Sequence, residues 1–206
     1  MLEINSFSKR YHEEKILSIE SLRLSPGVHL IKGDNGSGKT TFFKCLAGIS
    51  PASGEIRIDH LSLSEDPIAY RYQVNFSEAE PLYPGFLTAR DLTTFVGKTK
   101  KATPQQIRYY CHELGIDWFH EKSCGTYSSG MLKKLSLALA FLGEPKMIIL
   151  DEPLITLDDT TRTRLFKLIR EKREILFLLS SHQAIERGFL DVSSRFKIEN
   201  KTIALE

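Results

Sequence analysis

The feature that most restricts the fold is a glycine-rich loop at residues 33–40, which reads Gly-Asp-Asn-Gly-Ser-Gly-Lys-Thr. It follows an apolar run at residues 28–31, and its last residues begin a predicted helix. This helix is predicted to span residues 39–49 and to end before Pro51. A strand that enters such a loop and continues as a helix directs free backbone N–H groups at one point, where an anion can bind. The loop therefore predicts an α/β fold with a phosphate-binding site.

Each residue type in this loop suits a nucleotide phosphate. The glycines permit the backbone path, and Lys39 places a positive charge where the β- and γ-phosphates would lie. The Thr40 hydroxyl can ligate a Mg²⁺ ion that bridges those phosphates. We therefore predict that ATP and Mg²⁺ bind here, and the predicted nucleotide contacts are Gly33, Asp34, Asn35, Gly36, Ser37, Gly38, Lys39, Thr40 and Thr41.

Two carboxylates follow the apolar run at residues 147–150. A continuous apolar run is typical of a parallel strand that is covered on both faces, and ligands bind at the carboxyl ends of such strands. Asp151 is predicted to hold the Mg²⁺ ion, directly or through water. Glu152, the next residue, points elsewhere and is suited to polarise an attacking water molecule. The loop and the carboxylates together predict ATP hydrolysis.

The rest of the chain alternates between the two kinds of secondary structure. Strands are predicted at residues 2–7, 16–24, 28–31, 55–58, 68–76, 147–150, 175–179, 195–199 and 201–205. Helices are predicted at residues 39–49, 88–96, 104–114, 129–141 and 160–170. These elements indicate a P-loop NTPase core with a mostly parallel sheet, an N-terminal antiparallel β subdomain and an inserted helical subdomain. We expect one domain over residues 1–206, with the core at about 1–82 and 143–206 and the helical subdomain at about 83–142.

Composition excludes several other classes. The 28 basic and 26 acidic residues leave a net charge of +2, so no nucleic-acid partner is expected. Three well-separated cysteines favour reduced thiols in the cytoplasm, and we expect neither a leader peptide nor a membrane-spanning run of about 18 apolar residues. Local basic runs are expected to lie on solvated faces: Lys98, Lys100 and Lys101; Lys133 and Lys134; and Arg170, Lys172 and Arg173.

Residues 127–131, Tyr-Ser-Ser-Gly-Met, resemble the signature motif Leu-Ser-Gly-Gly-Gln of the ATP-binding cassette (ABC) family, in a Tyr-Ser-x-Gly-Met variant. Ser128 can also be explained as an ordinary helix N-cap. In this family the motif contacts the γ-phosphate held by the opposite subunit, so the resemblance implies that Ser128 and Gly130 bind the nucleotide of a second copy. Ser129 and Met131 depart from the motif.

Four further positions resemble functional positions of the same family. His182 corresponds to the switch histidine that reaches the γ-phosphate, and Asp158 to the D-loop aspartate that faces the other subunit. Tyr11 occupies the place of the aromatic residue that stacks on adenine. The stretch 81–88 resembles the segment after the Q-loop glutamine, which puts Glu78 at that position as a nucleotide contact and a further Mg²⁺ ligand.

The resemblance implies an ATP-hydrolysing motor subunit of a transporter, which forms a homodimer and drives a separate membrane permease from the inner face of the cell membrane. The permease is expected to dock near residues 78–88, and the short helical lobe with its variant signature favours an exporter. The first alternative is a soluble cassette protein of translation or DNA maintenance, although such relatives usually carry two cassettes or a long coiled coil. The second is a P-loop kinase or GTPase, although a guanine-reading Asn-Lys-x-Asp motif is absent.

Overall fold

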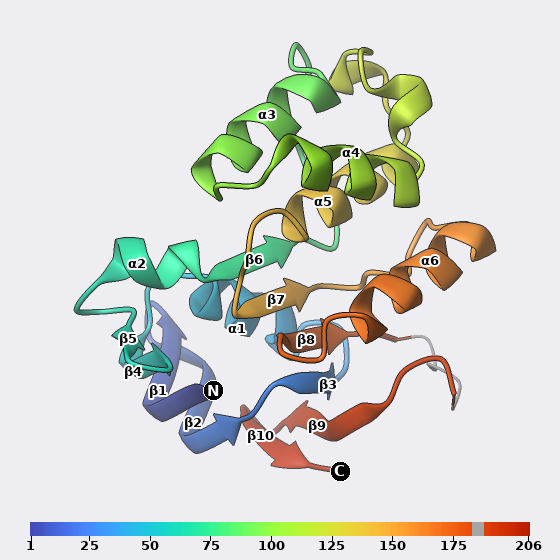
Figure 1. Cartoon of the computed structure of the whole chain (residues 1–206). Helices are drawn as coiled ribbons and strands as arrows, with labels where there is room; N and C mark the ends of the chain where they lie inside the picture. Colours follow the sequence, from blue (N-terminus) through green and yellow to red (C-terminus); the bar gives the residue numbers. More distant parts are fainter. Residues whose placement is uncertain (183–187) are drawn as a thin grey trace.

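The computed structural model describes residues 1–182 and 188–206, and its main sheet has six strands in the order β10-β9-β3-β8-β7-β6 (Figure 1). Neighbours from β9 to β6 run parallel, whereas β10 pairs antiparallel with β9. The strands are β3 (Gly27–Lys32), β6 (Val74–Ser77), β7 (Met147–Leu150), β8 (Leu176–Ser180), β9 (Val192–Glu199) and β10 (Thr202–Leu205).

A second, antiparallel sheet has the order β2-β1-β4-β5. Its strands are β1 (Leu2–Tyr11), β2 (Glu14–Leu24), β4 (Ser53–Ile58) and β5 (Leu61–Ser62). The helices are α1 (Lys39–Leu46), α2 (Pro67–Tyr72), α3 (Ala89–Thr99), α4 (Pro104–Glu113), α5 (Ser129–Ala140) and α6 (Asp159–Arg170), and short 3₁₀ turns span Asp117–Phe119 and Cys124–Thr126.

Two hydrophobic cores lie on opposite faces of the main sheet, because successive side chains of a strand point to opposite faces. In β8, Leu178 packs with α1 and the antiparallel sheet, where Phe7 meets Phe42 edge to face with ring centroids 5.5 Å apart. Phe177 faces the other way, into the core formed with α5, α4 and α6. Helix α1 is thereby held between the two sheets, which fixes the position of the loop before it.

The prediction of a strand over residues 68–76 is wrong for the first half of this range, which forms the helix α2. Asp66 caps this helix by accepting a hydrogen bond from the Ala69 N–H at 3.0 Å, and Pro67 occupies the first helical position. This Asp-Pro start signal outweighs the strand propensity of the isoleucine and tyrosines that follow. The strand β6 begins only at Val74.

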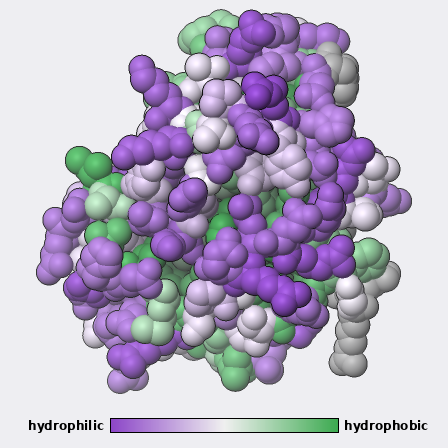
Figure 2. Space-filling view, viewed as in Figure 1, coloured by the Kyte–Doolittle hydropathy of each residue, from purple (hydrophilic) through white to green (hydrophobic). Residues whose placement is uncertain are grey.

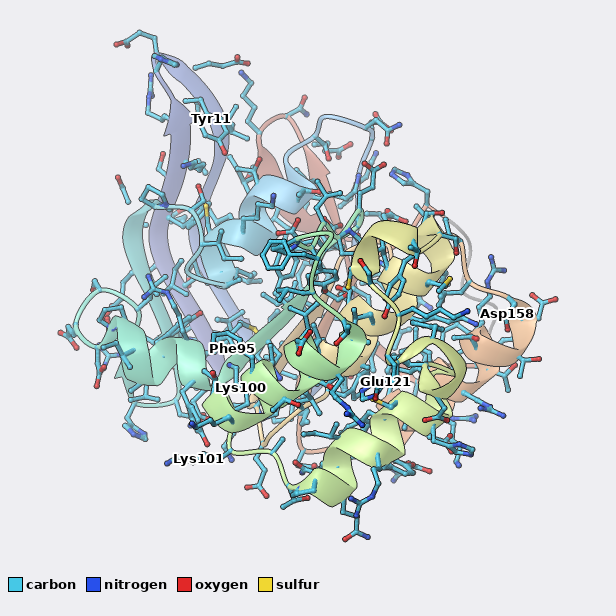
Figure 3. All side chains as sticks on the ribbon, turned by 90° about the horizontal axis from the view of Figure 1, so that it is seen from above. Tyr11, Phe95, Lys100, Lys101, Glu121 and Asp158 are labelled. Carbon is cyan, nitrogen blue, oxygen red and sulfur yellow. The ribbon has the colours of Figure 1, made fainter. Side chains whose placement is uncertain are left out.

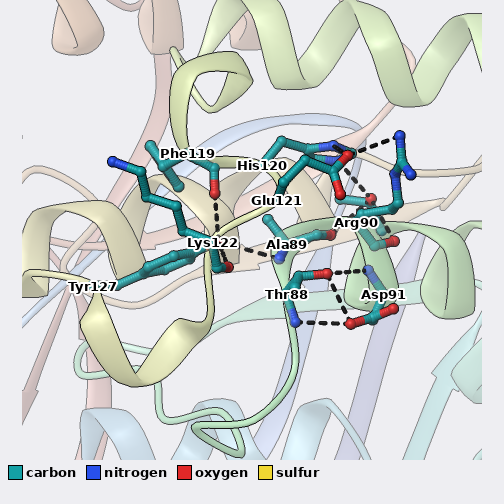
Figure 4. A network of polar contacts seen from close by, with 10 residues as sticks. Thr88, Ala89, Arg90, Asp91, Phe119, His120, Glu121, Lys122 and Tyr127 are labelled. Atoms are coloured by element: carbon teal, nitrogen blue, oxygen red, sulfur yellow. Dashed lines mark hydrogen bonds and ion pairs between the residues drawn. The ribbon is translucent and has the colours of Figure 1, made fainter.

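Helices α3, α4 and α5 form a lobe above the β6 edge of the main sheet, with α5 nearest the sheet (Figure 1). Figure 4 shows how the start of α3 is held: Thr88 and Asp91 form a capping box. The Tyr127 hydroxyl accepts a bond from the Ala89 N–H at 3.2 Å and contacts the Phe119 carbonyl at 2.9 Å. The tyrosine of the variant signature therefore ties the approach to α5 to the start of α3.

The surface in the same view is mostly hydrophilic, and apolar residues appear in separate patches in its middle and along its edges (Figure 2). Among residues 1–182 and 188–206, no helix is both long and apolar enough to cross a membrane. Cys45, Cys111 and Cys124 are buried free thiols, as expected.

Candidate nucleotide site

The glycine loop connects β3 to α1 at the carboxyl edge of the main sheet. Gly38 precedes α1 with a φ of +102°, and a Cβ atom there would lie 3.1 Å from the Ile16 side chain. A Cβ atom on Gly33 would lie 2.6 Å from the Ser37 hydroxyl. Because Gly38 offers no side-chain cap, the first N–H groups of α1 remain available for an anion.

The Lys39 ammonium bends back over the loop and donates to the carbonyls of Gly33 at 2.7 Å and Asp34 at 3.1 Å. The Ser37 hydroxyl is buried and has no hydrogen-bond partner in the part of the chain that the structure describes. Buried polar groups are normally paired. A buried cation and an unpaired hydroxyl beside a helix N-terminus fit the oxygens of a phosphate group.

The two predicted carboxylates are buried at the end of β7 and are held by neighbouring elements. Thr40 donates from its hydroxyl to Asp151 Oδ2 at 2.6 Å, which brings together the two predicted Mg²⁺ ligands. Ser180, at the end of β8, donates to Asp151 Oδ1 at 2.5 Å and accepts a bond from the Glu152 N–H at 2.8 Å. Hard oxygen donors of this kind suit Mg²⁺.

Ser180 was not among the predicted site residues. Ser180 directly follows the apolar run at residues 175–179. In the structure, Leu179 pairs in parallel with Leu150. The residues that follow these two partners therefore meet at the carboxyl edge of the sheet. A serine at the end of a strand can therefore be recognised as a partner of Asp151 only when the pairing of β7 with β8 is known.

Glu152 presents its carboxylate to the cleft from a strained backbone, with a φ of +44°. Its Oε2 accepts a bond from the His182 N–H at 3.2 Å, and Oε1 lies 3.5 Å from His182 Nε2. Among the residues that the structure describes, none forms a hydrogen bond to Oε1. A carboxylate anchored in this way at the edge of a cleft can orient a water molecule and accept its proton.

These residues line one cleft of about 510 Å³, within the usual range for small-molecule sites. The lining includes Asn35, Gly36, Ser37, Gly38, Lys39, Thr40, Thr41, Asp151, Glu152 and His182, all predicted from the sequence. It also includes residues that were not predicted: Ile16, Ala79, Glu80 and Ile155.

Several predicted residues are not part of this lining: Gly33 and Asp34 at the start of the loop, Tyr11, Glu78, and the residues of the signature and D-loop positions. Tyr11 lies half-exposed on the β1–β2 hairpin (Figure 3), where the Lys9 ammonium is 4.5 Å from its ring centre. The Glu78 carboxylate lies 3.7 Å from the ammonium of Lys44 on α1, and Glu80 lines the cleft instead.

The signature residues also lie outside the cleft, at the exposed N-terminus of α5. Ser128 caps α5 by accepting a bond from the Met131 N–H at 3.2 Å. Gly130 packs so closely that a Cβ atom there would lie 2.9 Å from the Thr156 carbonyl. Ser129 begins α5 without a positive φ, so its position does not require glycine.

Asp158 caps α6 by accepting a bond from the Thr161 N–H at 2.8 Å, and it forms an ion pair with Lys134 of α5 at 2.7 Å. The Lys134 ammonium and the Thr161 N–H together hold the pKa of the Asp158 carboxyl well below its usual range. This pair ties the helical lobe to the segment after Glu152, and Figure 3 shows Asp158 on the opposite side of the molecule from Tyr11.

Comparison with known proteins agrees with these features. The ABC transporter family profile matches residues 18–155. YxlF of Bacillus subtilis, an uncharacterised ABC transporter ATP-binding protein, is 33% identical in an alignment of 189 positions that covers 88% of this chain and 62% of YxlF. The cytochrome c biogenesis ATP-binding export protein CcmA of Legionella pneumophila is 30% identical in an alignment of 188 positions that covers 89% of this chain and 93% of CcmA.

A solved ATP-binding subunit of an ABC transporter has the same fold, with a TM-score of 0.90 at 24% identity over 100% of this chain and 89% of that one. The predicted fold class is thereby confirmed. Because the family profile covers more than half of the chain, and the phosphate loop and the acidic strand end meet in one cleft, the chain belongs to the ABC transporter family as an ATP-binding protein.

Proposed function

We propose that this chain is the motor subunit of an ABC transporter, which hydrolyses Mg²⁺-ATP as a homodimer and drives a separate membrane permease. The observation that carries the proposal is the Glu152 carboxylate, anchored by the His182 N–H and directed into the same cleft as Lys39 and Thr40. Family membership supports ATP hydrolysis by this arrangement.

We assign different roles to different residues of the cleft. The N–H groups of the loop and the Lys39 ammonium would bind the phosphates, and Thr40 and Asp151 would hold Mg²⁺, which neutralises phosphate charge when bound. Glu152 would orient the attacking water and accept its proton through its carboxylate, which lines the cleft. His182 keeps the Glu152 carboxylate in this orientation.

The position of the signature residues supports a head-to-tail dimer. Ser128 is exposed and lies outside the cleft of its own chain, at the N-terminus of α5, where N–H groups favour an anion. A second copy can therefore supply Ser128 and Gly130 to the γ-phosphate bound by the first. Such a site is complete only when two chains meet.

Mg²⁺-ATP should convert the chain from monomer to dimer when hydrolysis is blocked. We expect light scattering after size exclusion to give the dimer mass for Glu152→Gln with ATP, and the monomer mass without nucleotide. Adding Ser128→Arg should prevent dimerisation, because its long side chain fills the γ-phosphate contact, and should leave ATP affinity within about twofold. The head-to-tail dimer would be contradicted if the measured mass did not change when ATP is added. It would also be contradicted if the dimer still formed with Ser128→Arg.

The loop between β6 and α3 supports a permease partner, because it exposes two large apolar side chains. Leu82 is 87% exposed and Phe86 is 81% exposed. Side chains of this size on a loop beside the cleft suit an apolar partner surface. We propose that the permease docks here, which places the chain at the inner face of the membrane. The export role in the name of CcmA favours an exporter.

Purification from native membranes should recover an integral membrane protein with this chain. Replacing Leu82 and Phe86 together by aspartate should lower the recovered permease by at least about tenfold, because two charges replace buried apolar contacts. The control is Phe95→Asp on α3, another exposed aromatic residue, which should leave recovery unchanged. Equal losses in both variants, or recovery of ribosomes in place of a membrane protein, would refute the assignment.

A further inference from the structure

Lys133 of α5 is 1% exposed, although the basic run that contains it was expected to lie on a solvated face. Its ammonium donates to the carbonyls of Glu78 at 2.6 Å and Asp151 at 2.7 Å, and it also contacts the Ala79 carbonyl at 3.4 Å. An ammonium has three donors, so each one has an acceptor. These acceptors lie just after the ends of β6 and β7, so one side chain joins α5 to two strands at the edge of the cleft.

The contact with Asp151 bears directly on Glu152. The Asp151 carbonyl belongs to the peptide unit that links the two carboxylate residues, and the N–H of that unit is bonded to Ser180 at 2.8 Å. The peptide plane is therefore held on one side by Lys133 and on the other by Ser180. Because Glu152 has a positive φ, this orientation needs outside support.

Lys100, at the end of α3, makes a similar set of contacts away from the cleft (Figure 3). Its ammonium donates to the carbonyls of Arg71 at 2.6 Å, Val74 at 2.9 Å and Tyr72 at 3.1 Å. Burial lowers the pKa of both Lys100 and Lys133 to about 8. The two lysines thus attach the lobe at opposite ends of β6, and only Lys133 reaches the peptide between the carboxylates.

We propose that Lys133 is a positioning residue for ATP hydrolysis: through the Asp151 carbonyl it fixes the direction of the Glu152 carboxylate, and it makes that direction depend on the placement of the signature helix α5. The inference rests on the proposed hydrolysis and adds a link between the helical lobe and the reacting end of the cleft. The phosphate loop is not among the contacts of Lys133. The role therefore concerns turnover and not nucleotide binding.

The test compares Lys133→Met, Lys133→Arg and Lys100→Met in the full chain. Steady-state kcat and KM are measured with Mg²⁺-ATP, ATP affinity is measured in EDTA, and Tm is measured by thermal unfolding. We expect Lys133→Met to lower kcat about 30-fold or more, since displacement of a reacting group by about 1 Å can cost 10²-fold. KM and the affinity in EDTA should stay within about threefold, and Lys133→Arg should restore kcat to within about fivefold of the parent.

Lys100→Met should lower Tm about as much as Lys133→Met and keep kcat within about threefold. Equal kcat losses in the two methionine variants would overturn the proposal, as would a folded Lys133→Arg variant that does not recover. If Lys133→Met does not fold, Lys133→Gln, which is polar but shorter than lysine and uncharged, is expected to lower kcat by the same amount. A parent chain that binds ATP but does not hydrolyse it would refute the proposed function itself.

Discussion

Glu152→Gln should lower kcat for ATP hydrolysis by about 10³-fold, within the range expected for loss of a general base. The amide keeps the shape of the carboxylate, and its oxygen can still accept the His182 N–H that now bonds at 3.2 Å. It cannot accept the proton of the attacking water, which is the role proposed for the Glu152 carboxylate. ATP affinity should remain within about threefold, because the loop and Lys39 are unchanged. A phosphate-release assay measures kcat, and calorimetric titration measures affinity.

Two neighbouring glutamates provide matched controls for this change. Glu80 lines the same cleft, and Glu80→Gln should leave kcat within about threefold, since its carboxylate is not anchored by His182. Glu78 lies outside the cleft lining and faces Lys44, so Glu78→Gln should keep activity within about tenfold, or about 1.4 kcal/mol of barrier. If Glu80→Gln abolished turnover and Glu152→Gln did not, the general base would be Glu80.

The sequence predicted those parts of the site in which the functional residue types lie in a short stretch whose secondary structure can also be predicted. Residues 33–40 combine glycines, a lysine and a threonine at one strand-to-helix junction, so a single stretch defines both the backbone and the ligand. Asp151 and Glu152 follow a four-residue apolar strand, which places them at the carboxyl edge of the sheet. In both cases hydrophobic pattern and residue type lead to the same position.

The residues that were missed depend on tertiary contacts. Lys133 and Lys134 are adjacent in the sequence, but successive helical residues point about 100° apart. Lys133 is therefore buried beneath α5 whereas Lys134 reaches Asp158. Ser180 acquires its role from the pairing of β7 with β8, and no pattern local to residue 180 specifies that neighbour. Charge and composition alone could not assign the roles of these side chains.

Lys39→Met should weaken ATP binding by about 100-fold, which corresponds to about 2.7 kcal/mol. Methionine has a similar length but no charge, so the variant loses the charge-assisted contacts to the phosphates. The effect should be large because the Lys39 ammonium is buried beside the loop, where bulk water screens it little. Calorimetric titration with Mg²⁺-ATP measures the change directly.

The control is Lys44→Met on the same helix, where the lysine is partly exposed and lies 3.7 Å from Glu78. Exposed pairs of this kind contribute little, so ATP affinity should change by less than about twofold. Thermal unfolding provides an independent measurement, since ATP at 100 times its Kd stabilises the folded chain by about 2.7 kcal/mol. At the same ATP concentration, a 100-fold weaker Lys39→Met variant should gain only about 0.4 kcal/mol. Equal ATP-induced shifts in Tm for the parent and Lys39→Met would show that the ammonium does not contact the nucleotide.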